Sequence, residues 1–511
     1  MTDTSMSIYS TAQPFVKTKP PWIRDTQEQL RIGAYALYES IYNNNTKTFS
    51  LIGEDERTIY IPSGRVIVET MNRYVAPGLQ VVPDPAYGSD QEKLLATQVW
   101  TDFARRERFY SRFNSNKRYG IMRGDWAFHL YADPLRTETT RISCFGIDPA
   151  SLFPIYNPEN IDEIIGWHIV DNYLNDQGDS VIRRTTYRKT TGKGGPSPIT
   201  VEDGLYDPEE WGGPDMKEED VKLLQVIMPV TTLPEPIDHL PVYHIPNRDM
   251  PGQIWGKSEM QGLEVVMRAI SQGASDEDLT LAMDGLGVWV TDSGTPVNDE
   301  GEEEEWNMGP GRVVEIQTGR TFNRANANNS VTPYQDHLGY LHDQIDEAEG
   351  FSAISKGKVD VGVAESGVAL ALELSSILSS SGEKDQLVTD ALTNLLFDLP
   401  KWYIAYEGTA FRSLMDVTRW IPTYGDKIPR NKAQEITDLT ALTGAKIISK
   451  SYARQRLRTL GYTDMPEESV IAAEIEGEAM LDQDAFGARV DGEVNQELES
   501  GATGDQIEGT E

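Results

Sequence analysis

The sequence predicts an α+β protein built from several parts, and three observations support this class. Apolar residues recur at steps of three and four in a long helical segment, residues 366–399, which places them on one face. Short segments with strand periodicity follow one another between residues 124 and 245. A β-rich stretch, residues 286–333, lies between two helical stretches. The residues that form the packing face of the long helix are Val388, Leu392, Leu395 and Leu399.

Composition limits the kind of protein this is. The 511 residues carry a net charge of −35, and the sequence pI is near 4.5. Such acidity argues against a protein that reads DNA sequence, which usually presents a basic face. One cysteine and six histidines exclude a disulfide framework and a cysteine-based zinc site. The N-terminus lacks the basic and apolar regions of a signal peptide, and no apolar run is long enough to span a membrane, so we expect a soluble intracellular protein.

The first half of the chain is expected to begin with helices and continue with strands. Helices are predicted over residues 25–43, 65–74 and 91–118, with a turn at residues 62–64. Alternating apolar residues predict a strand over residues 124–133. Further strands are expected at residues 142–145, 152–156, 164–171, 182–187, 221–229 and 242–245.

The predicted helix over residues 91–118 carries the densest basic cluster of the chain. Basic clusters most often form a solvated face that pairs with nearby carboxylates, and contact with nucleic acid is the alternative. The cluster consists of Arg105, Arg106, Arg108, Arg112, Lys117 and Arg118.

The second half alternates helix, strand and helix. Helices are predicted over residues 258–284 and 334–350, and the best strands between them are residues 288–290 and 313–316. Pro400 should kink or end the long helix. Further helices are expected over residues 433–442, 450–460 and 467–478, with Ser449 as an N-cap. Residues 1–24 and the acidic stretch 479–511 bury little and are expected to be disordered.

No motif for catalysis or for a cofactor is present. A phosphate-binding loop needs a glycine, four residues and then Gly-Lys-Ser/Thr, whereas only three residues separate Gly252 from Gly256 in GQIWGKS. His337 and His342 are five residues apart on a helix, so they diverge, and His239 and His244 flank Leu240-Pro241 in a predicted loop. We therefore expect neither an enzyme nor a bound metal or cofactor.

Four short motifs follow one another in a distinctive order. A Gly-x-Ser motif opens a helix in residues 254–260 (IWGKSEM), and Gly-Pro-Gly precedes a strand in residues 308–316 (MGPGRVVEI). Ser-Gly-x-Ala-Leu opens the long helix in residues 362–374 (GVAESGVALALEL), and residues 447–461 (IISKSYARQRLRTLG) run from Ile-Ser to Leu-Gly. In this order of motifs the chain resembles the portal proteins of tailed double-stranded DNA phages. The resemblance covers about nine-tenths of the chain, and residues 299–305 and those after 487 match no motif.

The resemblance implies a portal fold, assembled as a dodecameric ring around a central tunnel. In such a ring the wing, stem, clip and crown surround the tunnel, a loop lines its narrowest part, and the clip lies at the narrow end of the ring. By position, the parts are the wing (25–257), the first stem helix (258–284), the clip (285–333), the second stem helix (334–350), the tunnel loop (351–365), the long wing helix with its return (366–428) and the crown (429–478).

The resemblance also implies where function lies. In the tunnel loop, Lys356 and Lys358 would face DNA while Asp360 and Glu365 limit the grip. The alternative is that the two lysines pair with carboxylates of the adjacent subunit. In the clip, the residues expected to dock partners are Trp289, Glu302, Glu303, Glu304, Glu305 and Trp306.

A portal would occupy one vertex of the capsid in the virion, after assembly in the host cytoplasm. Its implied partners are other copies of itself, double-stranded DNA passing without sequence specificity, terminase, a head–tail adaptor, and the major capsid and scaffolding proteins; no membrane is involved. Two other classes compete with this interpretation. A packaging ATPase or nuclease would need a phosphate-binding loop or an acidic metal cluster, and a head–tail adaptor is usually much shorter.

Overall fold

The computed structural model divides into two compact units, Met1–Lys427 and Ile428–Glu511. Helices and antiparallel sheets both occur in the first unit, in agreement with the predicted α+β class. The expected arm and tail, the strand at residues 313–316 and the helix at residues 467–478 lie outside the described residues. The structure describes residues 26–45, 59–136, 140–157, 159–174, 178–190, 198–208, 223–286, 288–292, 302, 319–325, 331–358, 367–408, 419–428 and 432–459.

Within the described residues, four helices precede the first large strand. The single helix predicted over residues 91–118 is wrong, because the chain turns at Glu107 and Arg108, where Arg108 takes a left-handed φ of 50°. Ser89 and Glu92 form a capping box that starts the first of these two helices. The turn predicted at residues 62–64 is also wrong in part, because a helix begins at Ser63. The helices are α2 (Thr26–Tyr42), α3 (Ser63–Tyr74), α4 (Asp90–Arg106) and α5 (Phe109–Arg123).

An aromatic cluster joins α4 and α5 to the strand that follows them. Phe109 and Phe113 stack on Phe128, with ring centroids 5.7 and 6.3 Å apart. Trp100 meets Phe109 edge-on at 5.1 Å, a geometry that aromatic pairs favour. Because these rings are almost completely buried, they fix the angle at which the two helices cross the sheet.

A three-stranded antiparallel sheet with the order β3-β2-β9 lies against these helices. Its central strand is buried on both faces. The alternation in the sequence therefore predicted the strand correctly, but it does not correspond to one buried and one exposed face. Gly124 ends α5 with a φ of 111°, and a Cβ there would lie 2.9 Å from the carbonyl carbon of Lys257. The strands are β2 (Asp125–Ala132), β3 (Ile142–Ile147) and β9 (Val242–Pro246).

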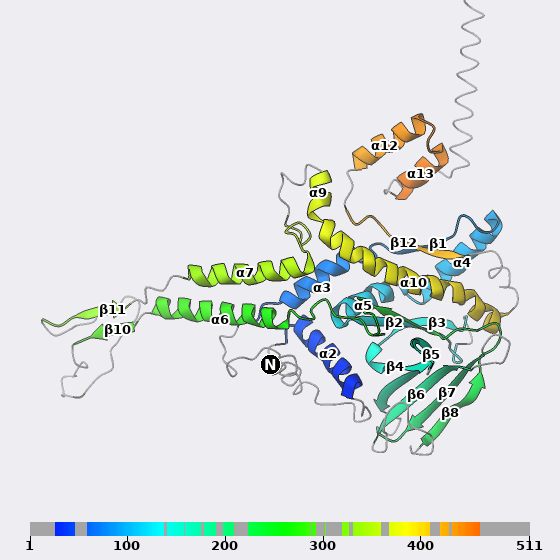
Figure 1. The fold of residues 1–511 in the computed structure, drawn as a ribbon, viewed down its shortest axis with the longest axis horizontal. Coiled ribbons are helices and arrows are strands. Elements are labelled where there is room, and N and C mark those ends of the chain that lie inside the picture. Colours follow the sequence, from blue (N-terminus) through cyan, green and yellow to red (C-terminus); the bar gives the residue numbers. More distant parts are fainter. Residues whose placement is uncertain are drawn as a thin grey trace, which may run out of the picture. The chain divides into compact units, whose positions relative to one another are not determined.

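A five-stranded antiparallel sheet, in the order β4-β5-β6-β7-β8, forms the lower right part of Figure 1. Phe153, Val170, Ile182 and Tyr206 form a buried cluster on it. A short 3-10 helix, η1 (Pro149–Ser151), leads into the sheet, and β7 was not predicted from the sequence. The strands are β4 (Leu152–Asn157), β5 (Asn160–Leu174), β6 (Ser180–Lys189), β7 (Ile199–Tyr206) and β8 (Leu223–Thr232).

The long helix α10 (Ser375–Glu407) passes through the middle of the first unit and packs against α3, β2, β9 and β12. Pro400 does not end it, because the helix continues for seven residues beyond, so the expectation that the helix stops there is wrong. The chain turns at Leu374 instead, which leaves α9 (Gly367–Glu373) as a separate short helix. The packing face is buried, with exposed fractions of 2% for Val388, 1% for Leu392 and 0% for Leu395 and Leu399.

A small strand pair lies beside α10 and α4. Strand β1 (Gln80–Pro83) pairs antiparallel with β12 (Trp420–Thr423), which joins residues more than 300 positions apart in the chain. The Trp420 side chain donates to the carbonyl of Ala96 at 3.2 Å. This contact holds the segment that follows α10 against helix α4.

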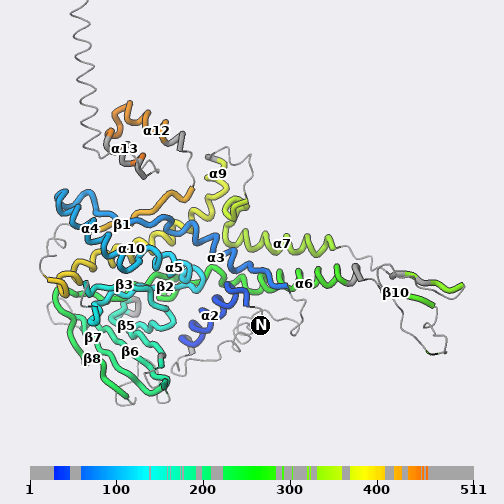
Figure 2. The backbone as a smooth tube through the Cα atoms, turned by 180° about the vertical axis from the view of Figure 1, so that it is seen from behind, coloured from blue at the N-terminus to red at the C-terminus, as the bar shows by residue number. Residues whose placement is uncertain are grey.

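Two helices run side by side toward a pair of short strands, as both views of the chain show (Figures 1 and 2). The first helix begins at Glu264, six residues after the predicted start, because residues 258–263 form turns. The second agrees closely with the predicted range 334–350. The elements are α6 (Glu264–Leu286), β10 (Val288–Thr291), β11 (Phe322–Ala325) and α7 (Thr332–Glu349).

The second unit contains two described helices, α12 (Lys432–Gly444) and α13 (Lys450–Thr459). Ser449 Oγ accepts from the backbone N–H of Tyr452 at 3.1 Å, so Ser449 caps α13 as predicted. None of the described helices in the chain is long and apolar enough to cross a bilayer.

Candidate functional site: the paired helices, their strand tip and the following loop

Close contacts bind α6 to α7 along their length. A Cβ at Gly273 of α6 would lie 3.0 Å from Leu338 of α7, so the glycine permits the helices to approach each other. Toward the strand end, Gln335 donates to Glu277 at 2.9 Å. Ile345 in α7 and Ile270 in α6 are buried, with exposed fractions of 5% and 0%. The two helices therefore pack against each other over several turns.

The same two helices expose large apolar side chains to solvent. Exposed apolar residues are common when scattered singly, but a series along one helix pair indicates a contact surface. These residues are Val265 (55% exposed), Leu279 (45%), Leu281 (50%), Tyr334 (36%) and Tyr340 (58%).

At the far end of the helices, β10 and β11 pair antiparallel, with Val288 opposite Ala325 and Thr291 opposite Phe322. Asp292 accepts from the backbone N–H of Thr321 at 2.6 Å, and this hydrogen bond lowers the pKa of the carboxyl. Of the predicted docking residues, Trp289 lies in β10 and Glu302 is exposed. Glu303, Glu304, Glu305 and Trp306 lie outside the described residues, so the docking role stays a prediction.

The loop after α7 folds back onto the helix. Gly350 ends α7 with a φ of 66°, and a Cβ there would lie 2.0 Å from Ser376 Oγ in α10, so only glycine fits. Lys356 forms an ion pair with Asp346 of its own chain, whereas Lys358 is exposed. The two lysines, for which the sequence predicted the same role, therefore have different environments in the structure. Asp360 and Glu365 lie outside the described residues.

A hollow of about 580 Å³ lies between α7 and this loop. Charged side chains border it, including Asp343, Asp346, Lys356 and Lys358. His342 also borders it, and the pKa of this histidine is lowered, chiefly by burial. The hollow is polar and open, which suits contact with a charged macromolecule better than the binding of a small apolar ligand.

The glycine-bearing segment before α6 does not form a phosphate cradle. Its backbone groups contact the protein instead: the N–H of Gly256 donates to Asp125 at 2.8 Å, and that of Glu259 to the carbonyl of Ile121 at 3.1 Å. Ser258 Oγ donates to the carbonyl of Met122 at 2.6 Å. Phosphate loops need free amides that converge on the anion. The segment is a connector between β9 and α6, exposed at Gly252 and buried at Ser258 and Glu259.

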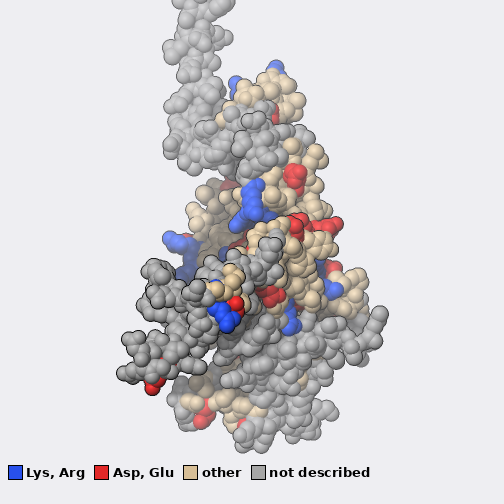
Figure 3. All heavy atoms as spheres, turned by 90° about the vertical axis from the view of Figure 1, so that its left-hand side faces the viewer, with Lys and Arg blue, Asp and Glu red and all other residues tan. Residues whose placement is uncertain are grey.

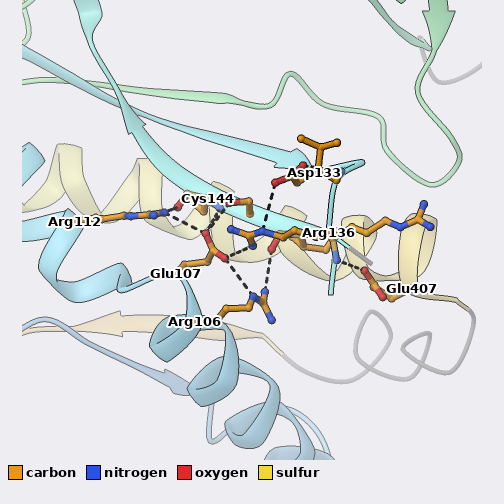
Figure 4. Close-up of polar contacts among 11 residues, drawn as sticks. Arg106, Glu107, Arg112, Asp133, Arg136, Cys144 and Glu407 are labelled. Carbon is orange, nitrogen blue, oxygen red and sulfur yellow. Dashed lines mark hydrogen bonds and ion pairs between the residues drawn. The ribbon is translucent and has the colours of Figure 1, made fainter. Parts of the chain in front are cut away.

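Two members of the basic cluster, Arg106 and Arg112, converge with Arg136 on one buried carboxylate at the corner between α4 and α5, as Figure 4 shows. Glu107 is 0% exposed and accepts from Arg136 at 2.5 Å, Ser143 at 2.7 Å and Arg112 at 3.2 Å. Arg106 approaches it at 3.3 Å. Burial acts to raise the pKa of Glu107, but the hydrogen bonds from Arg136 and Ser143 outweigh it, so the pKa is lowered.

Two further members of the cluster pair with other carboxylates. Arg118 pairs with Glu69 at 2.8 Å, and Arg105 pairs with Asp102 at 3.0 Å. Lys117 is buried and donates to the carbonyl of Val75 at 2.7 Å, while Arg108 is exposed. The predicted pairing with carboxylates is therefore confirmed for Arg105, Arg106, Arg112 and Arg118. On the face toward the free end of α6 and α7, the described basic and acidic side chains are interspersed (Figure 3).

One group of side chains has the composition of a metal site. Asp238, His239 and Asp398 place ligand atoms within 4.8 Å of one another. Lys401 already lies between the two carboxylates, 2.6 Å from Asp238 and 3.0 Å from Asp398. Trp402 donates to His239 Nε2 at 2.9 Å, so the other ring nitrogen carries the proton in the neutral ring. The Lys401 ammonium therefore occupies the position that a metal ion would need. Together these four side chains join α10 to the loop before β9.

Sequence reasoning missed a further group of charges at the base of α6 and α7, in which the half-exposed Arg248 meets the buried Glu259, Glu349 and Lys384. They come from three distant parts of the chain, so no spacing rule could have joined them. Glu259 lies within the IWGKSEM motif, which is the one signal the sequence offered.

Comparison with known proteins gives a distant likeness. Neither a protein-family model nor a curated protein matches the chain. Among solved structures, the fold is similar to a chain from the neck of a native GTA particle computed with C12 symmetry. That likeness covers 78% of this chain and 91% of the other, at 12% identity and a TM-score of 0.40. Because it is so distant, we base the functional proposal on this chain's own residues and elements.

Proposed function

We propose that the chain is a portal protein, which forms a ring at one capsid vertex and conducts DNA during packaging and ejection. The observation that carries this proposal is one continuous arrangement: α6 leads out to β10, β11 leads back into α7, and a glycine-started loop then leads toward the long helix α10. This arrangement supports the order of stem, clip, stem, tunnel loop and wing that the motifs suggested.

The exposed apolar side chains on α6 and α7 support assembly into a ring. A single chain leaves them in water, and a second copy of the helix pair would bury them. A ring needs head-to-tail contacts, because a contact that uses the same patch on both subunits closes only pairs. We infer that these exposed side chains pack against the helix pairs of the neighbouring subunits and that the pairs surround the channel.

Charge supports a passage for DNA in preference to a binding surface. Each cation placed on phosphate adds affinity through counterion release and slows movement. The chain carries a net charge of −35, and the basic residues Arg105, Arg106, Arg112 and Arg118 are paired with carboxylates. A channel wall that shared this acidity, repeated by ring symmetry, would repel the duplex and leave it mobile.

By this proposal the ring docks terminase and later a head–tail adaptor through the clip, and it contacts capsid and scaffolding proteins. We propose no catalytic role. The connector that most resembles a phosphate loop uses its amides within the protein.

The ring contact is tested by placing a charge on the helix pair. Tyr340→Asp and Leu281→Asp should leave the fold of the single chain intact, since both side chains are half-exposed or more. They should prevent ring formation, because the neighbour would bury an unpaired carboxylate. Leu135→Asp is the matched control, because Leu135 is 88% exposed and lies outside these helices.

Size-exclusion chromatography with light scattering measures the outcome at fixed protein concentration. Rings formed by the Leu135→Asp variant and not by the other two support the proposal. Rings formed equally by all three variants would remove α6 and α7 from the subunit contact.

The two lysines of the loop should behave differently. Lys358→Ala should change DNA handling without loosening the loop, because Lys358 is exposed. Lys356→Ala should loosen residues 351–358, because it removes the ion pair with Asp346. The readouts are the fraction of particles that retain the genome and the hydrogen exchange of the loop. Particles with Lys358→Ala that package and retain DNA like the parent would contradict a role for this lysine at the duplex.

A further inference from the structure

Charged side chains from three parts of the fold meet where α6 and α7 join the body. Arg248 and Glu259 come from the connector between β9 and α6, Glu349 is the last residue of α7, and Lys384 lies in the first half of α10. Three of them are buried: Glu259 is 0% exposed, Lys384 4% and Glu349 8%. A buried charge is costly unless it is fully paired, so the quality of each pairing decides its state.

The two carboxylates differ in how many donors and cations they contact. Glu259 accepts from Lys384 at 2.7 Å, from Arg248 Nε at 3.0 Å and from Asn247 at 3.4 Å. Glu349 is joined to the group through Arg248 Nη2 at 2.8 Å. That same nitrogen lies 2.9 Å from Glu259, so the two carboxylates share it. Glu349 is therefore a buried acid that shares one cation, Arg248, with a second carboxylate, Glu259, close by.

Both conditions favour the neutral acid. Burial penalises the charged form, and a neighbouring carboxylate adds repulsion. Burial is the larger cause and the charge of Glu259 the next, and together they raise the pKa of Glu349 to about 7, although Arg248 and Lys384 oppose the shift.

The position of Glu349 gives this titration a mechanical consequence. Gly350 follows it directly and packs against Ser376 of α10. The N–H of Phe351 then donates to the carbonyl of Asp346 at 2.8 Å, and Lys356 returns to the Asp346 side chain. The end of α7 and the loop 351–358 are thus anchored to the body beside Glu349.

We propose that Glu349 is a proton-operated latch, which holds the end of α7 and the loop after it against the connector and α10 when neutral and loosens them when ionised. The latch is a property of the single chain, so it stands or falls independently of the portal proposal. In a ring it would make the stiffness of the channel loop depend on pH near neutrality.

The sign follows from proton linkage. When the end of α7 opens, Glu349 enters water and its pKa returns toward 4.5, whereas in the closed state it is about 7. Between these values opening releases a proton, so the opening constant should rise by up to about tenfold per pH unit. Above the folded pKa both states are ionised and the constant should level off. The stabilisation is complete below the unfolded pKa and is lost as pH rises through the folded pKa.

The test is hydrogen exchange of peptides covering residues 341–358 in the full chain from pH 5.5 to 8.5, corrected for the intrinsic exchange rate at each pH. The parent should lose protection between pH 5.5 and about 7 and then reach a plateau. Glu349→Gln, which keeps the shape of the neutral acid, should remove this dependence and resemble the parent at pH 5.5. Glu347→Gln, at an exposed position on the same helix, should retain the dependence.

Two comparisons separate the latch from a purely structural role. His342 borders the same loop and remains in place in the Glu349→Gln variant, so the difference from the parent isolates Glu349. A Glu349→Gln variant whose protection changes with pH as in the parent would overturn the proposal. So would a variant that is less protected than the parent by the same factor at every pH.

Discussion

Leu395→Asp is expected to abolish the folded chain, because Leu395 is 0% exposed on the buried face of α10. The substitution removes a buried apolar side chain and places a carboxylate among Val388, Leu392 and Leu399 without a partner. Loss of a buried leucine alone costs about 2–5 kcal/mol, and an unpaired buried charge adds to it, so a loss of at least about 4 kcal/mol is expected. That is a large part of the stability of a typical protein.

The same substitution on the opposite face of the helix provides the control. Phe397 is 57% exposed two residues further along α10. Phe397→Asp should therefore change the free energy of unfolding little and leave soluble protein. Thermal unfolding followed by circular dichroism distinguishes the two variants. Equal stability of both would show that α10 does not pack through the face described.

Glu107→Ala is expected to have the second largest effect. It removes the carboxylate on which Arg106, Arg112 and Arg136 converge and leaves Ser143 without its acceptor. Removing one partner of a buried pair costs about 3–5 kcal/mol. We expect about 3 kcal/mol, the lower end of that range, because side chains of the arginines are 21%, 39% and 28% exposed.

Asp102→Ala is the matched control for Glu107→Ala. It breaks the Arg105–Asp102 pair, whose side chains are 81% and 68% exposed, and such surface pairs contribute between zero and about 1 kcal/mol. Denaturant titration compares the two. Similar losses in both variants would contradict the central role of Glu107.

The interactions of Glu107 also predict that the stability of the protein depends on pH. Because the pKa of Glu107 is lowered in the folded state, its contribution is present above the unfolded pKa and is lost as pH falls through the folded pKa. The stability difference between the parent and Glu107→Ala should therefore shrink in acid.

Much of the fold followed from periodicity, and the errors have local causes. The burial of one face of α10 and the ranges of α2, α7, β2 and β9 were predictable, because each has a clear pattern over its length. The break at Glu107 was missed because charged residues continue the helical composition across it. Pro400 did not end α10, because flanking residues such as Leu399 and Trp402 are almost completely buried and hold the helix together.

The candidate site was less predictable, for a physical reason. Sequence spacing located the loop of Lys356 and Lys358 but could not show that Asp346 pairs with the first lysine, since that depends on how the chain turns at Gly350. The group around Glu349 joins residues about 100 positions apart. Such contacts arise from packing of whole elements and leave no local signal.

The most direct test of the portal proposal is electron microscopy of the purified full chain with averaging of its assemblies. The proposal predicts a closed ring with a central channel that α6, α7 and the loop 351–358 border, and with the β10–β11 pair at one end. Purified parent protein that remains monomeric would contradict it. So would a ring whose channel is bordered by the β4–β8 sheet.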